Sequence, residues 1–229
     1  WSREGGMAAH IEMCNGNGFC RKLGAGTMCP SYQATRQEKD CTRGRANALR
    51  AVISGDLPAA KFTSHDLYGV LDLCLECKGC KTECPSNVDM AKLKYEFLAQ
   101  YYDAHGTPRR AKFFGNVART SRLGSRFAPV SNWVANSAPA RWLNQQTLGI
   151  SSRRQVPPFV RQTFESWFRS RSPINGDAVR GEVVLFHDTF MNHNYPDVGQ
   201  AAVKVLEASG YKIVLAPKVC CGRPMLSNG

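Results

Sequence analysis

The cysteines between residues 74 and 84 have a spacing suited to metal chemistry. They read Cys74-Leu-Glu-Cys77-Lys-Gly-Cys80-Lys-Thr-Glu-Cys84-Pro85, a C-x2-C-x2-C-x3-C-P run typical of the ligands of 4Fe–4S clusters. Three closely spaced thiolates can cover one face of an iron–sulfur cube. The fourth, followed by Pro, ligates the other cluster in two-cluster ferredoxins. One-electron transfer is the chemistry that such a centre supports.

The three clustered cysteines need a fourth ligand from elsewhere in the chain. Cys29 is our candidate, because Cys29-Pro30 repeats the Cys-Pro pair of Cys84-Pro85. We therefore predict a main 4Fe–4S cluster on Cys29, Cys74, Cys77 and Cys80. Zinc is the alternative, since C-x2-C pairs also build zinc sites. Those sites usually have two separated pairs, without the close third cysteine and the Cys-Pro ending.

A second cluster would use the remaining N-terminal cysteines. Cys14 and Cys20 are six residues apart, like the first and third cysteines of a complete run, but Asn17 occupies the middle place. Together with Cys84 they offer three ligands, so the fourth would be Asn17, Cys41, water or an outside group. A three-iron centre and a half-site without metal are the alternatives. Cys41 is favoured as a structural thiol.

Cys220-Cys221-Gly222 is a separate motif near the end of the chain. It follows an apolar segment that reads as a strand, and α/β sheets place their sites at the carboxyl ends of strands. Cys220 and Cys221 are candidates for a metal or redox motif, with an ordinary buried turn as the alternative. The further cysteines that would complete such a site are absent from the sequence. His187 and His193 could line it, although satisfied turn histidines are the more common case.

Composition places the protein in a reducing compartment. The chain has 229 residues, of which 43% are hydrophobic and ten are Cys, enough for one large or two small domains. The tight cysteine spacing and the lack of a leader disfavour a secreted disulfide scaffold. No apolar run is long enough to span a bilayer. We expect a cytoplasmic fragment of a longer polypeptide, since the sequence starts at Trp1 and stops soon after a motif.

The net charge of +12 is concentrated in one segment. Between Thr107 and Ser172 there are twelve Lys and Arg but a single acidic residue, Glu165. Nucleic acid is disfavoured as a partner because no nucleic-acid motif is present. Two candidate partners of the basic segment remain, an anionic membrane surface and an acidic face of a missing domain. We favour the second. Separately, Lys78 and Lys81 lie beside candidate ligands, where positive charge would raise a cluster's potential.

The elements that must position these residues divide the chain into three parts. Residues 1–106 read as a helical ferredoxin-like domain, 107–177 as a basic helical linker broken by prolines, and 178–229 as an incomplete α/β cysteine-rich domain. The expected fold class is thus α+β, with an all-helical domain followed by the start of a β-α-β unit.

Local signals define the individual elements. The patterns predict a helix over Ser31–Arg50, another capped by Ser64, and a third from Asp89 to Gly106, so that two helices hold the ligand loop. Beyond the linker, Glu182–Phe186 and Tyr211–Ala216 read as strands around a helix capped by Asp197. A right-handed crossover would make these strands parallel.

Several of these segments resemble a known family. They are Cys14-Asn-Gly-Asn-Gly-Phe-Cys20-Arg-Lys, Met28-Cys-Pro-Ser-Tyr-Gln-Ala-Thr-Arg36, Thr42-Arg-Gly-Arg-Ala46, the run around Cys74–Ser86, and Lys218-Val-Cys-Cys-Gly-Arg-Pro224. The chain resembles the C-terminal half of FAD-linked iron–sulfur oxidoreductases of the D-lactate and D-2-hydroxyglutarate dehydrogenase type. That half combines a ferredoxin-like domain with a CCG (cysteine-rich) domain.

The resemblance implies an oxidoreductase that converts a 2-hydroxy acid into a 2-oxo acid on a flavin. FAD would lie in an upstream domain of the same polypeptide, so this chain would contain no catalytic residue. Electrons would pass from flavin through the cluster to an acceptor, either quinone at the inner face of the membrane or a cytochrome. The alternative is a non-enzymatic iron–sulfur subunit of a glycolate oxidase, lactate-utilisation or heterodisulfide-reductase-like complex.

Overall fold

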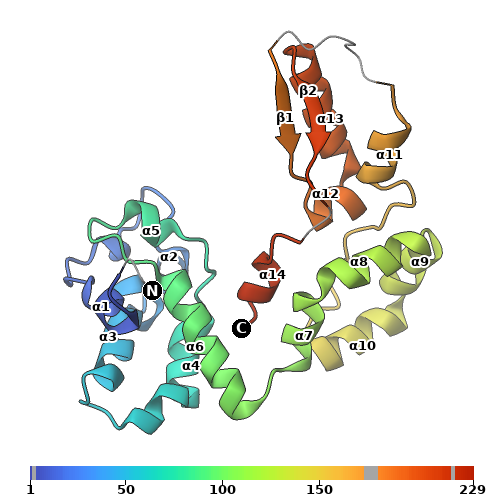
Figure 1. Ribbon diagram of the computed structural model, residues 1–229. Helices are drawn as coiled ribbons and strands as arrows, with labels where there is room; N and C mark the ends of the chain where they lie inside the picture. Colours follow the sequence, from blue (N-terminus) through green and yellow to red (C-terminus); the bar gives the residue numbers. More distant parts are fainter. Residues whose placement is uncertain (2–3, 173–179, 218–219) are drawn as a thin grey trace. The chain divides into compact units, whose positions relative to one another are not determined.

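The described part of the protein is mostly helical, with a two-stranded parallel sheet (Figure 1), which agrees with the predicted fold class. The structure is a computed structural model that describes residues 1, 4–172, 180–217 and 220–229. Lys218, Val219 and the predicted linker end at 173–177 lie outside the described residues. The described chain forms a helical unit, Trp1–Pro108 with Leu226–Gly229, and a mixed unit, Arg109–Met225.

Short helices joined by loops build the helical unit. They are α1 (Met7–Glu12), η1 (Phe19–Arg21), α2 (Pro30–Thr35), η2 (Glu38–Asp40), α3 (Thr42–Ile53), η3 (Ala59–Thr63), α4 (His65–Asp72), α5 (Gly79–Glu83) and α6 (Met90–His105). Two predicted caps are confirmed. The Ser64 hydroxyl accepts from the Leu67 N–H at 3.3 Å, and the Asp89 carboxylate accepts from the Lys92 N–H at 3.1 Å. Each cap provides a hydrogen-bond acceptor for a backbone N–H in the first turn of its helix.

The single helix predicted over Ser31–Arg50 is wrong, because the chain turns twice within it. Helix α2 ends at Thr35, and the next residue, Arg36, has a φ of 61° in the left-handed region. The next long helix, α3, begins after Cys41, whose sulfur caps it by accepting a hydrogen bond from the Gly44 N–H at 3.3 Å. A Cβ at Gly44 would lie 2.0 Å from the Glu38 carbonyl oxygen, so glycine permits this close approach.

One apolar core joins the helices of this unit to the cysteines. Leu93, Phe97 and Tyr101 share the buried face of α6, and the Phe97 and Tyr101 rings stack with centroids 5.7 Å apart. Buried Cys29 and Cys80 belong to the same core. Because close-packed cores resist rearrangement, two of the predicted ligands are held by the packing of the whole unit.

The rest of the chain alternates short helices with the two strands. The elements are α7 (Arg109–Gly115), α8 (Val117–Arg126), α9 (Val130–Asn136), α10 (Ala138–Leu148), α11 (Phe164–Ser170), β1 (Glu182–Leu185), α12 (Thr189–His193), α13 (Pro196–Ala208), β2 (Lys212–Leu215) and α14 (Arg223–Leu226). The predicted parallel pairing is confirmed, with Glu182 opposite Lys212 and Leu185 opposite Leu215. The cap predicted at Asp197 is wrong: Tyr195 occupies the N-cap position of α13 without a side-chain capping bond, and Pro196 opens the helix. Proline suits this position because it has no N–H to satisfy.

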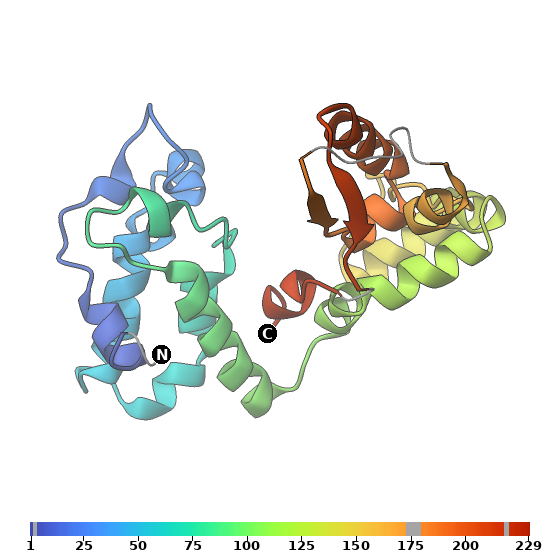
Figure 2. The ribbon, with the colours of Figure 1, turned by 45° about the horizontal axis from the view of Figure 1, so that its top comes forward.

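The basic helices and the strands fold together in the mixed unit. Phe164 of α11, Val203 of α13 and Ile213 of β2 form its buried core. Figure 2 shows the two strands and the helices of this unit from a second direction. From the basic segment, the Ser125 hydroxyl and His193 Nδ1 are hydrogen-bonded at 2.9 Å, and the Val160 N–H donates to the His193 carbonyl at 2.9 Å. The basic segment is therefore packed into the same compact unit as the sheet.

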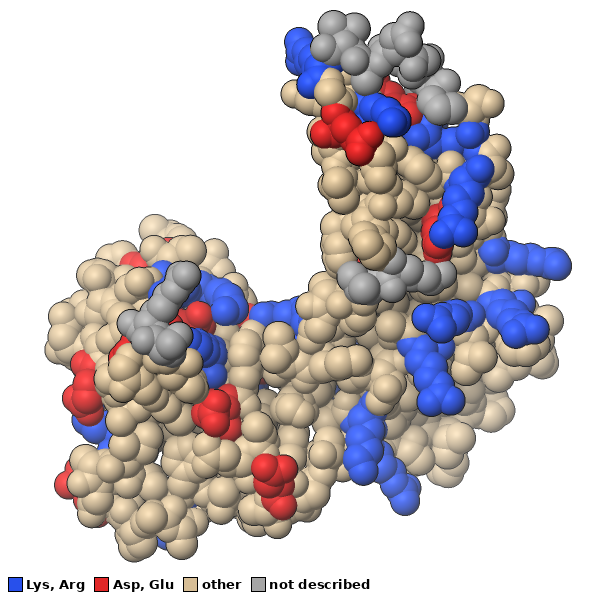
Figure 3. Space-filling view, viewed as in Figure 1, with Lys and Arg blue, Asp and Glu red and all other residues tan. Residues whose placement is uncertain are grey.

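Charge is distributed unevenly over the molecular surface. In the view of Figure 3, Lys and Arg predominate over the mixed unit, whereas both signs occur on the helical unit. This follows from the sequence, in which the excess of basic residues lies between Thr107 and Ser172. Among the described helices, none is long and apolar enough to cross a lipid bilayer.

Candidate metal centre

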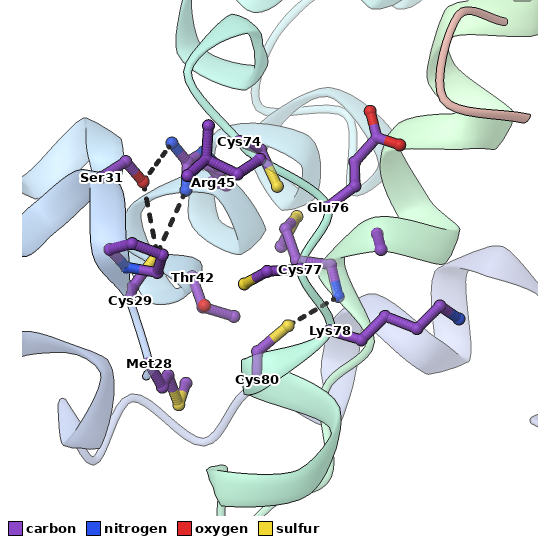
Figure 4. Close-up of a pocket in the computed structure, with 14 residues that line it drawn as sticks. Met28, Cys29, Ser31, Thr42, Arg45, Cys74, Glu76, Cys77, Lys78 and Cys80 are labelled. Carbon is purple, nitrogen blue, oxygen red and sulfur yellow. Dashed lines mark hydrogen bonds between the residues drawn. The ribbon is translucent and has the colours of Figure 1, made fainter. Parts of the chain in front are cut away.

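Four of the predicted ligands surround one hollow in the helical unit. Cys29, Cys74, Cys77 and Cys80 line it together with Met28, Ser31, Thr42, Arg45 and Glu76, among others. In Figure 4 the Cys74, Cys77 and Cys80 sulfurs face the same space from the ligand loop, and Cys29 lies on its other side. The structure thus brings two stretches of chain, some 45 residues apart in sequence, to one place.

The backbone of the ligand loop aims its three thiols inward. Glu76 and Lys78 have φ values of 53° and 60°, and these left-handed residues reverse the chain between successive cysteines. Cys80 then lies on α5, where its sulfur accepts from the Met90 N–H at 3.4 Å. Lys94 fastens the start of the loop, donating to the Asp72 and Cys74 carbonyls at 3.0 and 2.8 Å.

Cys29 is presented by a separate set of contacts. It is the residue before α2, and its sulfur lies 3.3 Å from the Ser31 hydroxyl. The Arg45 guanidinium approaches the same sulfur, with Nη1 at 3.5 Å. Hydrogen bonds to sulfur of this kind orient metal ligands and tune the metal that they hold.

Burial disfavours the thiolate form of two of these cysteines. It raises the pKa of Cys80 to about 11, partly opposed by the Met90 N–H. Burial also raises the pKa of Cys74, while the charges of Arg45 and Lys94 act in the opposite direction. Because thiolates are the ligands of iron, metal binding here would release protons.

The residues fit an iron–sulfur cluster in their chemistry. Four thiols match the ligand set of a 4Fe–4S cluster. Among the described residues, no three His, Cys, Asp or Glu side chains are gathered around a single ion position. The assignment of ligands to this hollow stays a proposal.

The cysteines of the second predicted centre lie elsewhere in the same unit. Cys20 is buried, and its sulfur accepts from the Arg43 N–H at 3.3 Å. A hydrogen bond from Cys41 is the main cause that lowers the pKa of Cys20. Asn17 is exposed, and its side-chain oxygen accepts from the Phe19 N–H at 2.9 Å. Cys14 and Cys84 are half-buried against the same core. Of the two fourth-ligand candidates within the chain, Cys41 is therefore the better placed.

The Cys220-Cys221 motif lies in the mixed unit. Cys220 lines a hollow with His187, His193 and Arg122, at the carboxyl end of β1, while Cys221 is exposed. His187 and His193 are both buried. The structure thus brings the two histidines to Cys220, as the sequence suggested. A metal at this motif remains a prediction.

The sequence interpretation missed two groups that shape the main hollow. Arg45 was overlooked. It shares a helix face with Leu49 and Val52, and an arginine in line with apolar residues at helical spacing indicates a buried charge. Glu83 was also overlooked. Its carboxylate pairs with Lys22 and accepts from the Thr27 N–H at 2.7 Å, and these contacts lower its pKa to about 2. They tie the loop before Cys29 to helix α5.

Comparison with known proteins supports the iron–sulfur chemistry. Residues 10–88 match the family described as 4Fe-4S dicluster domain. One subunit of the anaerobic glycerol-3-phosphate dehydrogenase from Escherichia coli K12 is 31% identical over 146 residues, which are 63% of this chain and 36% of that protein. D-2-hydroxyglutarate dehydrogenase from Pseudomonas putida is 23% identical over 94% of this chain and 25% of its own length.

A third relative comes from Bacillus subtilis. A protein named Probable glycolate oxidase iron-sulfur subunit is 24% identical over 91% of this chain and 48% of its own length. The chain thus spans less than half of each of these relatives. No solved structure matches significantly. Residues 10–88 are similar to 4Fe-4S dicluster domains, and the chain as a whole resembles the iron–sulfur parts of this group of oxidoreductases.

Proposed function

We propose that this chain is the iron–sulfur electron-transfer part of a flavin-dependent 2-hydroxy-acid dehydrogenase. The observation that carries the proposal is the hollow lined by Cys29, Cys74, Cys77 and Cys80. Four thiols around one space form a ligand set for a 4Fe–4S cluster, and the dicluster-domain similarity covers all four residues. When bound, such a cluster accepts and releases single electrons.

The protein residues around the hollow would hold the cluster and limit its exposure. Cys29 and Cys80 are buried, whereas Cys77 is exposed. Solvent and a redox partner can therefore approach the hollow from the Cys77 side. Met28 and Met90, each 1% exposed, cover the hollow on its protein side. Apolar cover of this kind lowers the local dielectric and so influences the potential of the cluster.

The flavin would belong to another domain or chain. D-2-hydroxyglutarate dehydrogenases match nearly all of this chain, which supports a 2-hydroxy acid as the substrate class. A separate electron-transfer subunit is the second candidate, because two of the relatives are named as subunits. Both candidates give this chain the same physical role, which is to receive electrons one at a time.

A reductive titration tests the proposed role. Anaerobically purified protein should lose visible absorbance as dithionite is added, at about one electron per cluster, and regain it when a one-electron oxidant follows. The fit of the four thiols to a cluster is the reason. Protein that contains iron and sulfide, yet neither takes up electrons nor returns them, would contradict the electron-transfer role.

The second centre gives a prediction of its own. We propose that Cys14, Cys20 and Cys84 hold a second cluster, so Cys20→Ala should lower the bound iron by about three to four atoms per chain and leave the main cluster in place. Cys41→Ala and Asn17→Ala identify the fourth ligand, since only the true one should reduce the iron content. Iron analysis with EPR spectroscopy makes the measurement. If Cys20→Ala keeps all its iron, these residues form a half-site without metal.

A further inference from the structure

Arg45 places a guanidinium inside the helical unit. Its exposed fraction is 0%, and it lies on the same buried face of α3 as Leu49 and Val52. Arginine is almost never fully buried unless it is paired, because taking one charge out of water costs several kcal/mol. A negative partner is therefore expected close to this side chain.

The partners of Arg45 do not include a carboxylate. Its Nε donates to the Val70 carbonyl at 3.1 Å, and its Nη2 donates to the Ser31 hydroxyl at 3.0 Å. Its third contact is the Cys29 sulfur, 3.5 Å from Nη1. Throughout the described part of the chain, no acidic side chain forms an ion pair with this guanidinium. A cluster bound at Cys29 would bring negative charge into direct contact with the guanidinium.

Acidic groups near the hollow have cations of their own. The Asp40 carboxylate pairs with Lys39 at 3.0 Å, and the Glu76 carboxylate lies 3.4 Å from Lys94 Nζ. The buried Asp40 carboxylate also interacts electrostatically with Arg45, although it forms no direct ion pair with it. The Arg45 guanidinium still faces the hollow and whatever occupies it (Figure 4).

We propose that Arg45 is the internal counter-charge of the main cluster, orienting the Cys29 sulfur and raising the reduction potential of the cluster. This inference rests on the proposed function. A cluster bound by four thiolates is an anion, and reduction adds one electron without breaking or forming a bond. A buried cation beside one ligand stabilises the more negative reduced state, since charges interact more strongly at low dielectric. Arg45 is a positioning residue that acts through Cys29 and through its field.

Lys78 provides a comparison within the same hollow. The sequence suggested that Lys78 raises the potential, but its Nζ lies 3.1 Å from an Asp89 carboxylate oxygen and its side chain is 47% exposed. Pairing and solvent both weaken its effect on the cluster. Arg45 has neither of these compensations. We therefore expect Arg45 to influence the potential more than Lys78 does.

Redox titration of matched variants tests the inference. The experiment uses the full chain, purified without oxygen, and compares wild type with Arg45→Met, Arg45→Lys and Lys78→Met. Midpoint potentials come from EPR-monitored titration, and iron and sulfide are counted for every sample. We expect the midpoint potential of Arg45→Met to fall below that of wild type by more than the fall in Lys78→Met. Arg45→Lys should lie between wild type and Arg45→Met, because it retains the charge.

Each outcome of this comparison decides the matter. An Arg45→Met protein with full iron and the wild-type midpoint potential overturns the inference, because a purely structural arginine would leave the potential unmoved. If Arg45→Met loses its iron, the iron content of Arg45→Lys tests the inference instead. Retained iron in Arg45→Lys supports the role of charge, whereas equal loss in both variants overturns it, since lysine keeps the charge but not the fork of donors. Wild-type protein without iron would overturn the proposed function itself.

Discussion

Replacing Cys29 by Ala removes the main cluster, so that bound iron falls by about four atoms per chain. Cys29 supplies the sulfur on the side of the hollow opposite the ligand loop. Without it, Cys74, Cys77 and Cys80 retain three of four ligands, and the opened iron is exposed to loss. Iron and sulfide analysis of anaerobically purified protein makes the measurement, with the EPR signal of the reduced protein as a second readout.

Thr42→Val is the matched control for Cys29→Ala. Thr42 lines the same hollow and is 2% exposed, but its side chain offers no thiolate. Valine has nearly the same shape, so this variant tests whether any change in the wall of the hollow releases iron. Iron should stay at the wild-type level in Thr42→Val. A Cys29→Ala protein with unchanged iron would mean that the two stretches of chain do not share one cluster.

Removal of iron by a chelator under reducing conditions should destabilise the helical unit by several kcal/mol. Metal that binds only the folded state adds its binding free energy to stability. The apo form also leaves Arg45 buried without the anion proposed to balance it. For a unit of about 110 residues, a loss of this size lowers the melting temperature by roughly 10 °C or more. Scanning calorimetry of holo and apo protein makes the measurement.

The mixed unit serves as the internal control in that experiment. Trp133, Trp142 and Trp167 lie in it, whereas Trp1 is in the helical unit, so tryptophan fluorescence follows mainly the mixed unit. Its unfolding should be the same in holo and apo protein, because the four thiols belong to the other unit. Equal melting of the helical unit with and without iron would show that the metal does not support its fold.

Local signals predicted those elements whose boundaries depend on nearby residues. Ser64 and Asp89 cap their helices as expected. Such a cap depends only on a side-chain oxygen two or three residues before a free N–H, so the local sequence is enough to predict it. The break between α2 and α3 escaped prediction. It depends on a left-handed Arg36 and on the close packing of Gly44 against Glu38, and composition does not reveal such contacts.

The sequence predicted that four cysteines would come together, but it did not predict the groups around them. Spacing and a repeated Cys-Pro pair pointed to Cys29, which lines the hollow with the three clustered cysteines. The charges around them could not be ranked from the sequence. Lys78 is adjacent to a predicted ligand but paired with Asp89, while Arg45 is remote from the loop in sequence yet 3.5 Å from the sulfur of Cys29, another predicted ligand. Only the tertiary fold decides which cation faces the hollow.

EPR spectroscopy of the dithionite-reduced chain, combined with counting of iron and acid-labile sulfide, tests the central claim most directly. We expect the signal of a reduced 4Fe–4S cluster, with at least about four irons and four sulfides per chain after oxygen-free purification. Protein that binds zinc alone, or that contains iron without sulfide, would contradict the iron–sulfur assignment on which the electron-transfer role depends.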